Sequence, residues 1–483
     1  MDADEPTHVV TAFCRHRGNV CLLRRSDAVG TYHGAWGGVS GFAEGDPDAQ
    51  VRVEIHEETG LDPESDVSLV RSGRPVEVTD SDLGREWVVH PYLFDVMVDR
   101  PTVARAHPEI TLSEEHTAAE WVPATAILEG DRETVPALWE VYERVAPTVR
   151  TIAADAEHGA SYLSIRALEV LRDRAGLLIA DRGGEPEADE PTADDGAGRA
   201  AADPAGEWDE LAALARRLLE ARPSMAVCRN RVNRAMAEAG EAVEGVETAT
   251  VDRATEATNE PDADGDGPAA PPADAVLEAT IAGIERAVSA DRAAADAASE
   301  FATGRVLTLS RSGTVREALR AGAPDRVFVA ESRPAREGVA VAEELAAESE
   351  FPITVHTDAA TAHVLATESI DALLVGADTV LPDGRVVNKT GTRAGAIAAA
   401  REGVPVYAVA ASDTVSTREA VNLESGDRSA IYDGTATIDV ANPTFDVTTP
   451  DAVTGIVTER GVVEPDEVSA IAAELRALET WRD

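Results

Sequence analysis

Lysine is nearly absent from this sequence. Lys389 is the only lysine among 43 basic residues, and the other basic residues are arginine. Acidic residues number 89, which gives a formal net charge of -46 at pH 7. A chain this acidic would repel a polyanion, which argues against direct nucleic-acid binding, whereas small phosphorylated ligands remain compatible with it. A carboxylate-rich surface suits high salt, where the Debye length falls to roughly 3 Å at 1 M. We therefore expect a halophilic protein that unfolds at low salt.

Cysteine is also scarce, and long apolar runs are missing. The three cysteines, Cys14, Cys21 and Cys228, have no metal-ligand spacing, and an odd number argues against a secreted disulfide framework. The first residues show no basic region followed by an apolar stretch, and no segment approaches a membrane-spanning length. The sequence therefore predicts a cytoplasmic protein in a reducing compartment, without a membrane partner.

The 483 residues are enough for about three structural units at roughly 150 residues each. Residues 1–147 alternate short β-prone runs with turns and one acidic helix, which predicts an α+β domain. Residues 148–300 are expected to be mainly helical, with helical periodicity over 153–181 and 208–220.

Two stretches of this helical part are rich in Asp, Glu, Ala, Gly and Pro and poor in aromatic residues. They lie near 182–206 and 241–272, and their composition predicts disorder. In so acidic a chain, solvated insertions between helices are the favoured interpretation, and an acidic interaction arm is the alternative.

Residues 301–483 alternate helical patterns with short, continuously apolar runs. Runs of this kind predict parallel strands covered on both faces, hence an α/β, Rossmann-like, doubly wound domain. Ligands of such sheets bind beyond the carboxyl ends of the strands. The expected strands are Val306–Leu309, Val327–Ala330, Ile353–Val355, Ala372–Val375 and Val406–Val409.

Three glutamates share one face of the acidic helix in the first domain. Glu54, Glu57 and Glu58 are spaced i, i+3 and i+4. Like charges at this spacing repel one another, and a hard divalent cation removes the conflict because magnesium prefers oxygen ligands. The alternative is an ordinary solvated acidic helix. Gly60 suits the left-handed position that ends a helix.

The surroundings favour the metal site. A glycine-rich segment, 36–46, leads into this helix, and the whole stretch resembles the Nudix box. The resemblance extends to an earlier strand, 20–25, and a later segment, 115–122. It implies that Glu54, Glu57 and Glu58 bind Mg²⁺, with Mn²⁺ as the alternative, and act catalytically on the diphosphate linkage of a nucleoside diphosphate derivative.

Two positions depart from the family pattern. Val53 replaces the arginine that precedes the first helix glutamate, with Arg52 one position away, and Asp46 stands where glutamate is usual in a loop that is one residue short. Loss of that arginine is expected to weaken the hydrolase activity.

The most informative string of the second half runs from Val375 to Thr392. Gly376 permits a tight turn after a strand, so Asp378 should project beyond the strand's carboxyl end. Four residues precede an alanine-rich helix, whose N-terminal amides and nearby ammonium could hold a phosphate. They are Asn388, Lys389, Gly391 and Thr392. Ordinary turn chemistry is the alternative, but the only lysine of the chain falls in this string.

Residues from about 153 to the C-terminus resemble the family that unites the alpha, beta and delta subunits of translation initiation factor 2B with ribose-1,5-bisphosphate and methylthioribose-1-phosphate isomerases. The motifs are Gly159–Ser161, Arg222–Ala226, Glu331–Pro334 with Gly338, the string from Gly376 to Thr392, and Thr458–Gly461. The resemblance implies that the domain binds a sugar phosphate or nucleotide and that it self-associates. Lys389, which follows the glycine-containing turn, and Arg333, which sits beyond a sheet strand, are predicted to hold the ligand phosphate.

One family position is altered. In the isomerases of this family a Thr-His-Cys sequence ends the first sheet strand, and the aspartate corresponding to Asp378 is the catalytic partner of the cysteine. Here Leu309 and Ser310 replace the histidine and the cysteine. A serine hydroxyl without an activating base is far less acidic than a thiol, so we expect little isomerase activity. A non-catalytic regulatory module, an initiation-factor-like subunit and an active sugar-phosphate isomerase remain alternatives for this domain.

Overall fold

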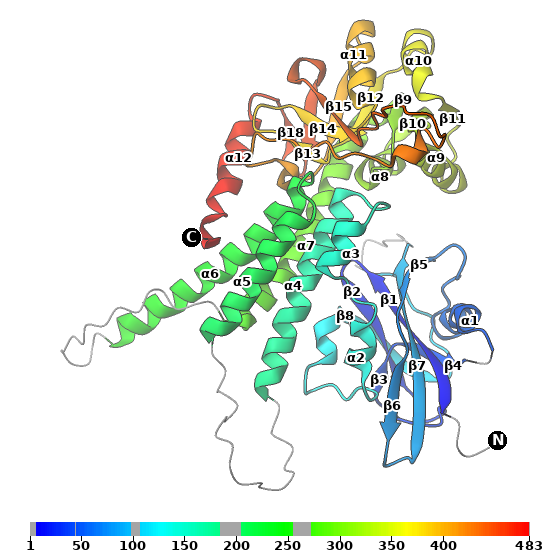
Figure 1. Ribbon diagram of the computed structural model, residues 1–483, viewed down its shortest axis with the longest axis vertical. Helices are drawn as coiled ribbons and strands as arrows, with labels where there is room; N and C mark the ends of the chain where they lie inside the picture. Colours follow the sequence, from blue (N-terminus) through cyan, green and yellow to red (C-terminus); the bar gives the residue numbers. More distant parts are fainter. Residues whose placement is uncertain (1–5, 44, 98–106, 184–203, 255–271, 483) are drawn as a thin grey trace. The chain divides into compact units, whose positions relative to one another are not determined.

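The computed structural model describes residues 6–43, 45–97, 107–183, 204–254 and 272–482 (Figure 1). The chain divides into two compact units. The first contains Met1–Thr148, Glu169–Glu207 and Pro272–Leu277, and the second contains Val149–Leu168, Trp208–Pro271 and Glu278–Asp483.

The first unit is built around an eight-stranded sheet whose main path is β3-β2-β1-β7-β5. Strands β4, β6 and β8 pair with β1, β7 and β2 respectively. The pairing of β1 with β7 is parallel, and the other pairs are antiparallel. The strands are β1 Thr7–His16, β2 Asn19–Arg25, β3 Trp36–Gly37, β4 Val39–Phe42, β5 Val67–Ser72, β6 Val76–Asp80, β7 Arg85–Val96 and β8 His116–Pro123.

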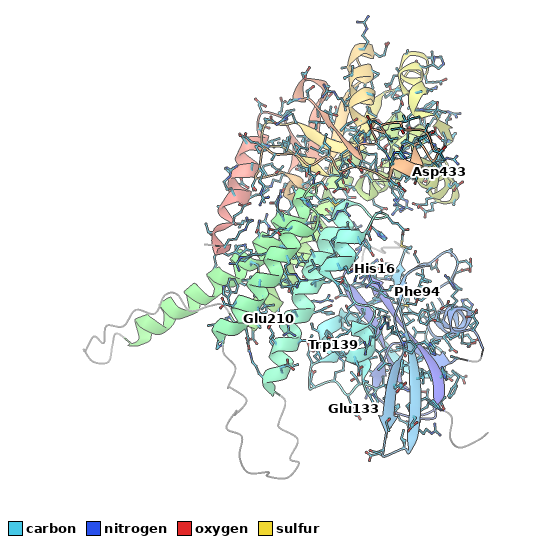
Figure 2. All side chains as sticks on the ribbon, in the orientation of Figure 1. His16, Phe94, Glu133, Trp139, Glu210 and Asp433 are labelled. Atoms are coloured by element: carbon cyan, nitrogen blue, oxygen red, sulfur yellow. The ribbon has the colours of Figure 1, made fainter. Side chains whose placement is uncertain are left out.

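Helices pack on both faces of this sheet because successive strand residues point to opposite sides. Ile55 of α1 (Pro47–Thr59) is buried in one cluster with Phe94 of β7. Leu138 of α2 (Leu138–Glu143) is buried in the other, against which Trp139 packs. Phe94 and Trp139, both labelled in Figure 2, therefore mark the two faces.

Buried ion pairs hold residues of α4 (Ala160–Gly183) within the first unit. Arg15 of β1 contacts Asp95 at 2.7 Å and Glu169 at 3.1 Å. Arg172 pairs with Asp173 at 2.7 Å and donates to the carbonyl of Gly18 at 2.5 Å. Breaking a buried pair by removing one partner costs about 3–5 kcal/mol. The α4 segment from Glu169 onward is thus part of the packing around β1.

Helices occupy the described part of the region that was predicted to be helical. They are α3 Val149–Ala154, α4 Ala160–Gly183, α5 Pro204–Ala221, α6 Ala226–Ala254 and α7 Ala273–Ala298. The expected helix over 153–181 is therefore two helices, and the one expected over 208–220 is α5. The division between the compact units falls inside α4, α5 and α7.

The prediction of disorder from residue 241 was wrong in its first part, because α6 continues to Ala254. The reason is that this acidic stretch is also rich in alanine and glutamate, which are strong helix formers. The remainder of that stretch, 255–271, lies outside the described residues, as does 184–203 of the other predicted insertion.

The second unit contains a seven-stranded sheet in the order β11-β10-β9-β12-β15-β17-β18. All neighbouring pairs are parallel except β17 with β18. The strands are β9 Thr303–Leu309, β10 Ala323–Ala330, β11 Ile353–His356, β12 Ala372–Gly376, β15 Val406–Val409, β17 Gly455–Thr458 and β18 Gly461–Val463. The five strands expected from the apolar runs are confirmed, and four of the runs are largely buried, whereas Val355 of the edge strand β11 is exposed.

Buried residues of this sheet divide between two clusters. One contains Val315 of α8 (Gly313–Ala321) and Leu345 of α9 (Glu337–Glu348). The other contains residues of α10 (Thr361–Thr367), α11 (Thr392–Glu402) and α12 (Val468–Ala477). A small antiparallel sheet, β13-β14-β16, completes the unit. Its strands are Thr379–Val380, Val386–Lys389 and Phe445–Thr448.

Candidate functional site

Helix α1 presents the three glutamates from a well-capped framework. The side chain of Asp46, the N-cap residue, accepts a hydrogen bond from the amide of Asp48, and Gly60 ends the helix in the left-handed conformation with φ 72°. The predicted role of Gly60 is therefore confirmed. Of the three carboxylates, Glu57 is exposed, Glu54 is partly buried and Glu58 is buried.

Glu58 is held against the glycine-rich strand β4. Its Oε2 accepts a hydrogen bond from the Ser40 amide at 3.0 Å and lies 3.9 Å from His116 Nε2. Burial is the main reason that the pKa of Glu58 rises to about 8, and the charges of Glu54 and Glu115 raise it further. A buried carboxyl with this pKa carries a proton at neutral pH unless a cation is present to stabilise its charge.

Glu54 is oriented by a residue that the sequence reasoning missed. Gln50, one turn earlier, donates to Glu54 Oε1 at 2.7 Å. Burial raises the pKa of Glu54, and the negative charges of Glu57 and Glu115 add to the effect. A Cβ at position 41 would overlap the Glu54 carboxylate, so glycine there permits this orientation of the Glu54 side chain.

The structure shows which residue contacts Glu54 in place of the family arginine that Val53 replaces. Val53 is 45% exposed and has no polar group with which to orient Glu54. Arg52 cannot take over this task, since its guanidinium donates to the carbonyl of Pro63 at 2.9 Å and lies over the ring of Phe94. Gln50 provides the hydrogen bond instead, and its i, i+4 spacing from Glu54 was the signal that could have identified it.

Glu115, just before β8, is a second residue that the prediction did not place in the site. Its charge acts on both Glu54 and Glu58. Arg25, at the end of β2, is the cation on this side, and it contributes opposite charge to both Glu58 and Glu115. The charges of Glu54, Glu58 and Glu115 thus act on one another with the Arg25 guanidinium as the opposing charge at two of them, which leaves the region with an excess of negative charge.

The chemistry of these groups suits a magnesium ion, since all the donors are hard carboxylate oxygens and a dication would relieve their repulsion. Over the described ranges, no three His, Cys, Asp or Glu side chains are grouped closely enough to form a metal cluster. The carboxylates therefore influence one another electrostatically, but they are not arranged as a closed coordination shell.

In the second unit, polar residues gather after the carboxyl ends of β9, β10 and β12. Asp378 follows β12 and is partly buried. Burial raises its pKa to about 7, against the opposing charges of Lys389 and Arg222, while Glu424 and Glu337 raise it further. The residues with the greatest electrostatic influence on Asp378 thus come from several parts of the chain.

Glu337 joins two of the predicted site residues. Its Oε2 accepts the hydroxyl hydrogen bond of Ser310 at 2.7 Å, and its Oε1 contacts Lys389 Nζ at 2.9 Å. The amide of Ser310 in turn donates to Ser332 Oγ at 2.7 Å. The sequence suggested that Ser310 has no basic partner, but in the structure the Glu337 carboxylate accepts the hydrogen bond of its hydroxyl group.

At the N-terminus of α11, a carboxylate of the same chain contacts two backbone amides. The amides of Gly391 and Arg393 donate to the carboxylate of Asp446, at 2.8 and 3.1 Å. A phosphate at the Gly391 amide would therefore have to displace the Asp446 carboxylate, and the phosphate contact expected of Asn388, Lys389, Gly391 and Thr392 stays a prediction. Thr392 donates to the carbonyl of Lys389 at 2.7 Å and accepts from Asn388 at 2.9 Å, so both residues shape the β14–α11 turn.

Arg333 lies three residues beyond the end of β10, directly after Ser332. Its amide donates to Asp358 at 2.7 Å, and its side chain is exposed. Arg222 and Glu424 also belong to this region, with Arg222 Nη2 3.7 Å from Glu424 Oε2. Glu424 could not have been assigned from the sequence, because its segment has no recognisable pattern.

Two family models match the chain, and together they cover both sets of residues. A NUDIX domain is matched over residues 5–145, which include the α1 carboxylates. The Initiation factor 2 subunit family is matched over residues 156–465, which include Ser310, Asp378 and Lys389. The chain belongs to the Initiation factor 2 subunit family. It also carries an N-terminal NUDIX domain, so the fusion expected from the motifs is confirmed.

Similar proteins include a "Methylthioribose-1-phosphate isomerase" of Pseudomonas aeruginosa, 39% identical over 175 residues, which are 33% of this chain and 48% of that protein. A "Probable bifunctional methylthioribose-1-phosphate isomerase/methylthioribulose-1-phosphate dehydratase" of Nocardia farcinica is 37% identical over 242 residues, which are 42% of this chain and 44% of that protein. The chain spans about half the length, or less, of these relatives.

Among solved structures, translation initiation factor eIF-2B of Pyrococcus horikoshii OT3 is similar with a TM-score of 0.47 at 24% identity, over 66% of this chain and 95% of that chain. 5-Methylthioribose 1-phosphate isomerase of the same organism gives a TM-score of 0.45 at 19% identity, over 75% and 90%.

The structure also shows the state of the three cysteines. Cys14, Cys21 and Cys228 are unpaired and buried, and burial raises the pKa of each thiol. In the parts of the chain that the structure describes, no helix has the length and apolar character needed to cross a membrane.

Proposed function

We propose that the NUDIX domain hydrolyses the diphosphate linkage of a nucleoside diphosphate derivative, with Glu54, Glu57 and Glu58 as metal-binding and catalytic residues. The observation that carries this proposal is the crowding of acidic charge at α1. Burial and the neighbouring carboxylates raise the pKa of both Glu54 and Glu58. Burial and mutual repulsion make the ionised form of these carboxylates unfavourable, and a bound cation would stabilise that form.

Bound Mg²⁺, or Mn²⁺ in its place, would neutralise the phosphates and lower the pKa of a coordinated water. Residues of the chain orient the carboxylates and provide a nearby positive charge. Ser40 and Gln50 fix the orientations of Glu58 and Glu54, and Arg25 provides a positive charge beside Glu58. These contacts limit the conformations of the two carboxylates on one face of α1, which reduces the ordering that metal binding requires.

Turnover of a panel of nucleoside diphosphate derivatives by the full chain tests this function, with Mg²⁺ and high salt present. Glu57→Gln and Glu58→Gln should each lower kcat by roughly a hundredfold or more, because each removes a charged oxygen ligand. Glu77→Gln, at an exposed position of β6, is the matched control and should leave the rate unchanged. Unchanged turnover in both site variants would reject metal binding at α1.

For the second domain, we propose binding of a sugar phosphate or nucleotide beyond the carboxyl ends of the sheet. Arg333 and Lys389 supply positive charge for phosphate, while Ser310, Asn388, Gly391 and Thr392 shape the site around Asp378. The isomerase names of the relatives support a sugar phosphate as the ligand class. The arrangement of helices on both sheet faces supports the Rossmann-like, doubly wound description.

An active sugar-phosphate isomerase is the second candidate for this domain, and one contact favours it. The Ser310 hydroxyl donates to Glu337, so a proton acceptor is already in position. The pKa of Asp378, raised to about 7, suits a group that exchanges protons at neutral pH. A purely regulatory, initiation-factor-like module requires neither feature.

Three further expectations complete this proposal. The domains are taken as residues 1–147, 148–300 and 301–483. The protein is expected to act in the cytoplasm of a halophile, because of its net charge of -46 and its single lysine. We also propose that it self-associates through its C-terminal part, and light scattering of the full chain at high salt would test this by giving at least twice the 50.8 kDa chain mass.

A further inference from the structure

Lys389 already has a counter-ion. Its ammonium lies 2.9 Å from Glu337 Oε1, and both side chains are largely buried, at 22% and 15% exposure. Burial limits solvent screening, so this pair is stronger than an exposed one. A phosphate can use the charge of Lys389 only by competing with the Glu337 carboxylate.

Glu337 is also fixed on its other side. Its second oxygen accepts the hydrogen bond from Ser310 at 2.7 Å. The residue lies in the first turn of α9, where a carboxylate is favoured by the helix dipole. Gly338, which follows it, packs so closely on the Ala330 carbonyl that a Cβ would overlap that oxygen. The backbone beneath Glu337 is therefore tightly set, and its carboxylate is directed at Ser310 and Lys389.

The surrounding charges do not favour an additional phosphate at Lys389. Glu424 contributes negative charge at Asp378, and the nearby cation Arg222 lies 3.7 Å from Glu424. Each positive charge next to Asp378 thus has a carboxylate partner. Arg333 differs, because its guanidinium is exposed and no hydrogen bond or ion pair of that group is seen among the described residues.

We propose that Glu337 is a specificity-determining residue, which lets the site accept a sugar with one phosphate, at Arg333, and disfavours a second phosphate at Lys389. This inference rests on the proposed sugar-phosphate function. The hydroxyl groups of the sugar then meet Ser310 and Glu337, since a carboxylate is a good acceptor for hydroxyl donors. A sugar bisphosphate brings a second dianion against the Glu337 carboxylate, where like charges repel.

Calorimetric titration of the full chain with ribose 5-phosphate and with ribose 1,5-bisphosphate tests the proposal. Wild type should bind the monophosphate at least as tightly as the bisphosphate. In Glu337→Gln, the bisphosphate affinity relative to the monophosphate should rise roughly tenfold or more, about 1.4 kcal/mol. Glutamine has nearly the same shape and keeps one acceptor oxygen for Lys389, while its amide NH2 can donate to the Ser310 hydroxyl oxygen, so the fold should persist.

Glu343→Gln is the matched control, because it removes the same charge from an exposed position of the same helix, and it should leave the preference unchanged. Glu337→Ala provides a second variant with the same expected direction. An unchanged preference in both Glu337 variants would overturn the assignment, as would a wild type that already binds the bisphosphate more tightly. If neither sugar binds to any variant or to wild type, the sugar-phosphate function itself fails, and the assignment fails with it.

Discussion

The amide of Ser40 donates to the carboxyl group of Glu58 at 3.0 Å, so strand β4 and the acidic helix α1 meet at a buried carboxyl group. This contact lowers the pKa of Glu58, but the cost of burial is larger and raises it to about 8. The first unit therefore folds around a carboxyl that is most stable in its protonated form when no cation is bound.

Metal-free wild type should lose stability as the pH rises towards 8, and Glu58→Gln should reduce this loss. An unfolded glutamate titrates near 4.3, so between about 4.3 and 8 the folded state binds more protons than the unfolded state. The contribution is complete below the lower value and is lost as the pH rises through the upper one. Its slope is at most about 1.4 kcal/mol per pH unit.

Thermal unfolding in a chelator at several pH values, at constant high salt, measures this difference. The Tm of Glu58→Gln should change less with pH than that of wild type, and added Mg²⁺ should raise the Tm of wild type more than that of the variant. Parallel Tm curves for the two proteins would show that Glu58 does not carry the raised pKa.

Lys389→Ala should weaken binding of ribose 5-phosphate by roughly 2 kcal/mol through the loss of a nearby positive charge, although the phosphate itself is assigned to Arg333. The variant removes a positive charge and also leaves Glu337 without its partner, and both changes disfavour an anion. Calorimetry with ribose 5-phosphate is the measurement. Adding Glu337→Gln to Lys389→Ala should recover part of the affinity, and equal affinity in wild type and Lys389→Ala would refute the role of the lysine.

The affinity for ribose 5-phosphate should also depend on pH through Asp378. Its pKa is raised to about 7, so the carboxyl is mostly neutral below that pH and negative above it. Anion binding should therefore weaken as the pH rises from 6.5 to 8. The phosphate itself titrates near 6, so Asp378→Asn serves as the reference. The ratio of wild-type to variant affinity should fall with pH, and a constant ratio would contradict the assignment.

Much of the two sites follows from short sequence spacings. Glu54, Glu57 and Glu58 could be placed on one helix face because their spacing matches the helical period. Asp378 could be placed beyond a strand end because Gly376 closes a continuous apolar run. These inferences depend only on local structure, which neighbouring residues largely determine.

The parts that could not be predicted are contacts between distant segments. Glu337 and Lys389 are 52 residues apart, and Gly391 and Asp446 are 55 apart. Nothing in the composition around Glu337 or Asp446 shows which partner each carboxylate meets, because the sheet order β10-β9-β12 and the pairing of β14 with β16 decide it. The chemistry of the second site therefore depends on topology more than on its motif.

Helix propensity explains why α6 extends into the segment that was predicted to be disordered. Low aromatic content and many acidic residues suggested disorder from residue 241, yet α6 continues to Ala254. Composition measures how much apolar surface a segment can bury, whereas alanine and glutamate lower the cost of extending a helix that has already formed. The start of α6 is buried from Ala226 onward and provides that nucleus.

Ser310→Cys tests whether the second domain retains isomerase chemistry. A cysteine of lowered pKa is partly ionised at neutral pH, whereas serine depends on Glu337 to accept its proton as the reaction proceeds. We expect wild type to bind ribose 1,5-bisphosphate weakly and to convert it slowly or not at all, and the cysteine variant to gain a trace of turnover. The assay follows ketose formation by NMR, with Asp378→Asn as the inactive reference. Wild-type conversion on the order of 1 per second or faster would identify an active isomerase and would make Ser310, Glu337 and Asp378 its catalytic set.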